Sequence, residues 1–258
     1  MRTLCVGGMS LSGVLWMASL TGAAFIIALI TNAVATGGAL FVMPLLALVF
    51  PVRQVVVMTT PMLWANALLA WWNYRRAWRV RRALITIPWV LLGLIGGVHL
   101  LKILPHGLLT RLVGSIALLF ASYEIWRRHR QTQLQGLAPG WGLPVGLASG
   151  IMSALSNIGG TLLSLYVLSP ETSPDELVGS IAFLSMLMTS AKFVLYAQGF
   201  PHLMTARAIL WSLPAIPALW IGGQIGKHLH ARIDAARFRT IILAIVIVSG
   251  AFLVTTAL

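Results

Sequence analysis

Six stretches of the chain stay apolar over roughly the 20 residues that a helix needs to cross a lipid bilayer. Short polar or basic segments separate these stretches along the chain. The pattern therefore predicts an all-α polytopic membrane protein. The expected membrane-spanning helices lie at residues 54–73, 83–101, 107–126, 177–197, 205–225 and 237–257.

Two further apolar segments have unusual lengths. Residues 13–50 are too long for one span, and residues 141–169 are long and rich in small side chains. Each segment holds an adjacent pair of glycines, although glycine costs a helix interior about 1 kcal/mol relative to alanine. The pairs, Gly37-Gly38 and Gly159-Gly160, mark either a break in the helix or a seam where helices pack closely. Arg2 and the apolar run after it imitate a signal peptide, but we expect the segment to be retained because the run continues to Phe50.

The two unusual segments occupy matching places in an internal repeat. Sliding the chain on itself by 122 residues aligns the two glycine pairs. Slides of 123 and 126 residues align Pro51 with Pro174 and Pro88 with Pro214. Matches in this order and at this near-constant spacing are typical of a two-fold repeat. We therefore divide the chain into a first transmembrane repeat (1–128), a cytoplasmic linker (129–140) and a second transmembrane repeat (141–258).

Composition and charge agree with a membrane protein. The chain is 59% hydrophobic and 9% charged, whereas a soluble domain is about 25% charged. Its net charge of +13 comes from short basic blocks between apolar segments, so we expect the lipid bilayer, and no nucleic acid, as a partner. A single cysteine, Cys5, and the lack of an H-E-x-x-H motif predict no metal site, no cofactor and no intramembrane enzyme.

The basic residues distinguish two topologies of the repeat. If each unusual segment crosses once, the repeats are parallel, with ten basic residues inside and seven outside. If each is a hairpin that enters and leaves on one side, the repeats are inverted, with twelve inside and five outside. Cytoplasmic loops carry an excess of Lys and Arg. We therefore predict two inverted repeats, each a broken or re-entrant helical hairpin followed by three transmembrane helices, which is a transporter architecture.

The two glycine motifs resemble those of a known family. ATGGALFVMP at 35–44 and NIGGTLLSLY at 157–166 are similar to the paired motifs of the sulfite exporter (TauE/SafE) family of bacterial inner-membrane permeases. Tyr166 stands where that family often has proline. The resemblance implies a multi-pass protein of the bacterial inner membrane that transports sulfite, organosulfonates or related small anions, and we expect export. The alternatives are uptake of another organic anion such as a carboxylate, or an anion channel. A coupling proton or ion and the oligomeric state stay open.

The helix breaks are the expected binding site. The helix after each glycine pair begins with N–H groups that have no intrahelical partner and carry positive partial charge. Two such ends, one from each repeat, would converge on an anion near the midplane. Hydroxyl and amide side chains flank the breaks, and their alternative role is to cap the broken helices. The candidates are Asn32, Thr36, Gly37 and Gly38 in the first half, and Ser153, Ser156, Asn157, Gly159 and Gly160 in the second.

One lysine lies within a predicted span. Lys192 has no acidic residue within one helical turn, and a charge there costs at least about 2.5–3.5 kcal/mol. An anionic substrate would offset this cost. The alternatives are that Lys192 snorkels to the interface or makes a structural contact to a carbonyl. The corresponding span of the first half contains Thr59 and Asn66, and a shift of 126 residues puts Asn66 opposite Lys192.

Overall fold

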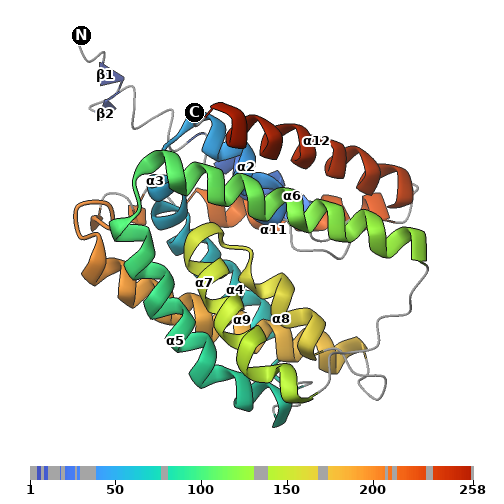
Figure 1. Cartoon of the computed structure of the whole chain (residues 1–258). Helices are drawn as coiled ribbons and strands as arrows, with labels where there is room; N and C mark the ends of the chain where they lie inside the picture. Colours follow the sequence, from blue (N-terminus) through green and yellow to red (C-terminus); the bar gives the residue numbers. More distant parts are fainter. Residues whose placement is uncertain are drawn as a thin grey trace.

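A computed structural model describes most of the chain, and the protein it shows is almost entirely α-helical (Figure 1). The described residues are 5–6, 9–10, 18, 21–26, 28–29, 39–76, 81–130, 139–167, 174–206, 209–210, 214–230 and 235–256. Near the N-terminus, the two-residue strands β1 (Cys5–Val6) and β2 (Met9–Ser10) pair antiparallel. In chain order the helices are α2 (Ala39–Val49), α3 (Val52–Met58), α4 (Thr60–Tyr74), α5 (Arg81–Ile103), α6 (His106–Arg130), the 3-10 turn η1 (Pro139–Trp141), α7 (Gly142–Ser156), α8 (Gly159–Val167), α9 (Pro174–Gly199), α11 (Ala215–His230) and α12 (Ala235–Thr256).

The helices confirm a polytopic membrane protein. Within the part of the chain that is described, four segments are long and apolar enough to cross a membrane: Val52–Trp72, Leu84–Ile103, His106–Trp126 and Glu176–Gly199. Each coincides with a span predicted from the sequence. The α12 helix covers a fifth predicted span and has a shorter apolar core, Leu243–Thr255.

Two predicted spans are interrupted, and prolines explain both interruptions. The span expected at 205–225 is not one helix, because α11 begins only at Ala215, directly after Pro214. Proline has no N–H and disfavours a helical conformation in the residue before it. The span expected at 54–73 is divided into α3 and α4 at Thr59, two residues before Pro61. Pro61 cannot donate to the carbonyl of Val57, so the helix loses a rung there.

Helices α5 and α7 pack against each other through glycine. A Cβ atom on Gly93 of α5 would lie 2.2 Å from the carbonyl oxygen of Leu147, and one on Gly150 of α7 would lie 2.2 Å from that of Val90. Small residues let two helix backbones approach this closely. Gly146 faces Thr86 and Trp89, whereas Gly97 faces Ile151 and Ala154, so the two helices run in the same direction.

The α7 and α8 helices form a hairpin. At its tip, Gly159 contacts the backbone of Ser149 and Ser153, and at its base the Tyr166 hydroxyl lies against Gly142. The α8 helix therefore returns antiparallel to α7, and both ends of the hairpin lie beside the first turns of α5. The tip, at Asn157 and Ile158, lies level with the last third of α5, where Gly97 meets Ala154.

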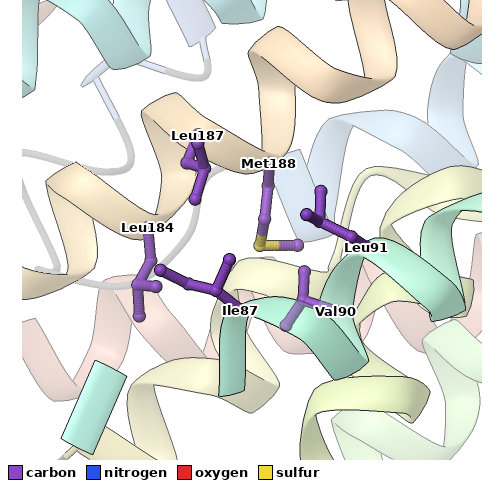
Figure 2. A pocket seen from close by; sticks show the side chains of 6 residues that line it. All are labelled: Ile87, Val90, Leu91, Leu184, Leu187 and Met188. Carbon is purple, nitrogen blue, oxygen red and sulfur yellow. The ribbon is translucent and has the colours of Figure 1, made fainter. Parts of the chain in front are cut away.

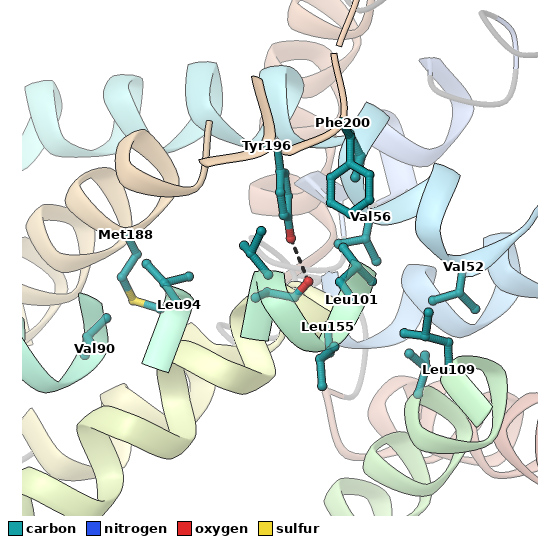
Figure 3. Close-up of a cluster of buried hydrophobic side chains, with 14 of the residues drawn as sticks. Val52, Val56, Val90, Leu94, Leu101, Leu109, Leu155, Met188, Tyr196 and Phe200 are labelled. Carbon is teal, nitrogen blue, oxygen red and sulfur yellow. Dashed lines mark hydrogen bonds between the residues drawn. The ribbon is translucent and has the colours of Figure 1, made fainter. Parts of the chain in front are cut away.

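The hydrophobic core follows the same helices. Its largest cluster joins α3, α5, α6, α7, α8 and α9 around side chains such as Leu94, Leu101, Leu155 and Met188 (Figure 3). A second cluster lies between α6 and α12, which run side by side in Figure 1. There Gly114 faces Leu253 and Val254, and Gly250 faces Leu118. The pairing of an early residue of α6 with a late residue of α12 makes these two helices antiparallel.

Candidate functional site

The tip of the hairpin is built around one asparagine. Asn157 ends α7 in the left-handed conformation, with φ 60° and ψ 15°, and it is the one non-glycine residue with positive φ among the described residues. Asparagine tolerates this conformation better than most residues. Two residues later α8 begins at Gly159, where a Cβ would lie 2.0 Å from the carbonyl oxygen of Ser149. Asn157 therefore makes the turn, and Gly159 leaves room for the returning helix.

Lys192 of α9 reaches this tip. The side chain is buried, with 2% of its surface exposed. Its Nζ donates to the carbonyl and hydroxyl oxygens of Ser153, both at 3.3 Å, and to Oδ1 of Asn157. All three acceptors are neutral, and the described residues offer this ammonium no carboxylate. Lys192 does not snorkel to the interface; it contacts a carbonyl, and it contacts two polar side chains as well.

The other end of the Asn157 amide reaches the first half of the chain. Its Nδ2 donates to Oγ1 of Thr59 at 3.2 Å and points at the sulfur of Met43 at 3.7 Å. Thr59 is fully buried at the junction of α3 and α4, and its own hydroxyl donates to the carbonyl of Val55 at 2.7 Å. One amide thus connects residues from both halves of the protein.

Helix α9 also holds the last turn of α7. The final carbonyls of a helix have no intrahelical donor. Ala154 O accepts from the buried hydroxyl of Tyr196 at 2.6 Å instead (Figure 3). One residue earlier, Ser153 O accepts from the Asn157 backbone at 3.1 Å and from Lys192 as well. Lys192 and Tyr196 are one turn apart on α9. The positive charge of Lys192 therefore lies at the negative end of the α7 dipole, close to the N-terminus of α8.

The structure brings five of the predicted site residues together: Thr59, Ser153, Asn157, Gly159 and Lys192. Gly160 follows in the first turn of α8, with Ser185 of α9 as its nearest side chain. Ser156 is buried beside the tip, and its hydroxyl donates to Met152 O at 2.8 Å. Asn66 lies in α4, which begins directly after Thr59, but its side chain is exposed. Asn32, Thr36, Gly37 and Gly38 lie outside the described residues.

The sequence analysis missed three residues of this cluster. Met43 and Tyr196 contact it from apolar stretches, where a sequence pattern gives no reason to single them out. Ser149 precedes Ser153 by one turn on α7; it is fully buried, and its Oγ has no hydrogen-bond partner among the described residues. The spacing of Ser149, Ser153 and Asn157, four residues apart, is a signal for one polar helix face.

Other features of the molecule suit an anion less well. A small pocket between α5 and α9 is lined by apolar side chains alone: Ile87, Val90, Leu91, Leu184, Leu187 and Met188 (Figure 2). Such a lining offers no donor to an oxyanion. Over the residues described, no group of three or more His, Cys, Asp or Glu side chains is arranged to hold a metal ion.

Fold and site together define a multi-pass helical membrane protein with an interrupted helix beside a buried cation, an arrangement typical of secondary transporters. The model of the sulfite exporter TauE/SafE family matches residues 20–253. The chain belongs to this family, as its glycine motifs predicted, and the family assigns it to membrane transport of sulfur-containing anions rather than to an enzyme class. Comparisons with curated proteins and with solved structures give no match.

Proposed function

We propose that the protein is a secondary transporter of the bacterial inner membrane that exports small sulfur-containing anions such as sulfite or organosulfonates. The anion binds near the midplane, between broken-helix motifs of two inverted repeats. The observation that carries the proposal is the cluster of Lys192, Asn157, Ser153 and Thr59, because it joins a buried cation to neutral polar side chains from both halves of the chain.

The arrangement of the helices supports inverted repeats. Helices α6 and α12 end the two halves and run antiparallel, as inversion requires, whereas parallel repeats would orient them alike. Trp64 donates to Ser190 at 2.9 Å, and these positions are 126 residues apart, the repeat shift found in the sequence. Contact between equivalent positions is expected at a two-fold axis. Gly222 of α11 packs on the backbone of Phe25, much as α5 packs on α7.

The α7–α8 hairpin supports a re-entrant element. Both of its ends lie beside the start of α5, and its tip lies within the length of that helix. Backbone that leaves the helical conformation at membrane depth must be buried in protein or line a cavity. Lys192 and Tyr196 donate hydrogen bonds to the last turn of α7 and to the tip, and the Asn157 amide donates to Thr59, so the tip fits the first of these conditions.

The site residues divide into distinct roles in this proposal. Lys192 supplies the charge, while Ser153, Ser156, Asn157 and the first N–H groups of α8 at Gly159 and Gly160 supply neutral contacts. Thr59 orients the Asn157 amide. The first hairpin contributes the matching set of Asn32, Thr36, Gly37 and Gly38, while the exposed Asn66 is left outside the site.

A binding and transport experiment tests the proposal. Purified protein is screened by thermal shift against sulfite, thiosulfate, methanesulfonate and short carboxylates, since a ligand stabilises the folded state by RT ln(1 + [L]/Kd). Flux of the stabilising anions is then measured in proteoliposomes loaded on one side. Lys192→Met should weaken binding about 30-fold or more, because it removes a buried charge partner.

Lys102→Met is the matched control. Lys102 is an exposed lysine in the last turn of α5, and its loss should leave the affinity unchanged. If folded Lys192→Met binds the anions as tightly as the original protein, Lys192 does not belong to the site. If none of the anions binds or crosses, the proposed substrate class is wrong.

A further inference from the structure

The sequence gives the number of charged residues in the segments around the hairpin tip, and the structure shows where they lie. Residues 13–50 and 141–169, which contain both glycine motifs, have no charged residue and no histidine. The same is true of α4, Thr60–Tyr74, and between residues 177 and 199 of α9 the one charged side chain is Lys192. The segments that meet at the hairpin tip therefore carry a single formal positive charge.

Charged groups on the neighbouring helices are engaged or directed elsewhere. Arg53 of α3 donates to the carbonyls of Leu101, Lys102 and Leu104 at the end of α5. His99 and Lys102 of α5 are exposed. The tyrosine nearest the tip, Tyr196 of α9, is buried, and its hydroxyl donates to the carbonyl of Ala154. Glu124 of α6, the helix whose Ala117 and Ala121 cluster with Ile158, is buried as well, but it makes no contact with Lys192. In the described part of the chain, the hydrogen-bond partners of the Lys192 ammonium are all neutral oxygens.

We propose that this site accepts singly charged anions and rejects dianions with the same head group; the inference rests on the proposed function. One monoanion beside one buried ammonium gives a loaded site with no net charge. A dianion would keep a second negative charge that no described residue neutralises, and an unpaired charge in a low-dielectric interior is strongly unfavourable.

The contacts of Lys192 show where the anion binds. In this structure Oδ1 of Asn157 and two oxygens of Ser153 occupy the donors of the ammonium. An oxygen of the monoanion takes the place of Oδ1, and the neutral amide turns its Nδ2 from Thr59 toward the bound anion. Hydrogen bonds between a charged donor and a charged acceptor are stronger than those to a neutral amide, which favours the exchange.

Two anions with similar tetrahedral head groups and different charges test the inference. Methanesulfonate is a monoanion and sulfate is a dianion. Isothermal titration of the full-length protein should show methanesulfonate binding at least about tenfold more tightly than sulfate. Equal affinity, or tighter binding of sulfate, with both dependent on Lys192, overturns the charge rule and leaves the proposed transport function intact. If neither anion nor sulfite binds, the proposed function fails and the charge rule fails with it.

Sulfite provides a second test because its charge changes near neutral pH. As pH rises, bisulfite loses its proton and becomes the dianion. The affinity for sulfite, expressed per total sulfite, should fall more steeply over this interval than the affinity for methanesulfonate, whose charge is constant. A sulfite affinity that rises with pH contradicts the inference. A parallel fall for both anions also contradicts it, since the change would then lie in the protein.

Asn157→Asp tests the same charge rule by changing the charge of the site instead of the charge of the anion. Aspartate also tolerates the left-handed backbone conformation and places a carboxylate next to Lys192, so the site becomes neutral before any anion arrives. The variant should remain folded, with a melting temperature no lower than that of the original protein, and should lose methanesulfonate binding. Retained binding overturns the inference. If the variant does not fold, the inference is tested by the affinities of the original protein for methanesulfonate and sulfate.

Discussion

The two faces of helix α7 differ in what they are made of and in what they contact. One face presents Gly142, Gly146, Gly150 and Ala154 at four-residue intervals, and its last three members pack on α5 at backbone distance. The other presents Ser149, Ser153 and Asn157 at the same interval, toward α8 and α9. A single 15-residue helix therefore carries a packing surface and a polar surface side by side.

Because the two faces differ, substitutions on them should change different properties of the protein. The glycine face is filled by its neighbours, because Gly146, Gly150 and Ala154 lie against α5 and Gly142 lies against the Tyr166 hydroxyl. On the polar face, the Ser149 hydroxyl has no partner in the described part of the chain, and Ser153 and Asn157 accept from the ammonium of Lys192 on α9. Changes on the first face should alter stability, whereas changes on the second should alter binding.

The largest expected effect is at Gly93 of α5, which packs against the glycine face of α7. Gly93→Ala places a methyl group 2.2 Å from the carbonyl oxygen of Leu147, so α5 and α7 must separate. We expect a loss of at least about 2 kcal/mol of stability, seen as a lower melting temperature and a low yield of monodisperse protein. Gly96→Ala is the control on the same helix, because a Cβ there meets nothing within 4 Å. Equal melting temperatures for the two variants would show that the glycine face does not carry the packing.

An intermediate effect is expected where the two faces meet. Tyr196→Phe keeps the ring and removes the hydroxyl that donates to Ala154 O. A hydrogen bond between membrane helices contributes about 1 kcal/mol, so the melting temperature should fall modestly while anion affinity stays nearly constant. Tyr74→Phe, which removes an exposed hydroxyl, should change neither quantity. A large loss of affinity in Tyr196→Phe would instead make Tyr196 part of the binding surface.

Much of this organisation could be predicted from local sequence signals. Apolar length gave the helices, and the Asn-x-Gly-Gly stretch at 157–160 predicted the break that Asn157 makes. A break and a small-residue seam were alternatives for this region, and α7 contains both, on different faces. The division of 54–73 was not predicted, although its Thr-Thr-Pro sequence carries the signal, since proline removes one helix hydrogen bond.

Tertiary partners could not be predicted in the same way. Lys192 was conspicuous as a lone charge, but its partners Ser153 and Asn157 lie 39 and 35 residues away in sequence. The repeat shift pointed to Asn66 as its counterpart, whereas Thr59, two turns earlier on that span, makes the contact to Asn157. The rotation of the helix about its axis determines whether Thr59 or Asn66 faces the hairpin tip. Alignment of the two repeats in sequence does not give this rotation. Inversion of the repeats and the role of the first hairpin stay predictions.

The smallest expected effect tests whether the polar face serves the anion. Ser149→Ala removes a fully buried hydroxyl that has no partner among the described residues, so stability should stay the same or rise slightly. If the face binds the anion, the lost hydrogen bond should weaken methanesulfonate binding about three- to tenfold. Ser164→Ala is the control, because that hydroxyl already donates to Thr161 O at 2.7 Å within α8. If Ser149→Ala is more stable and binds methanesulfonate with unchanged affinity, Ser149 serves packing only. The binding residues would then be Ser153, Asn157 and Lys192.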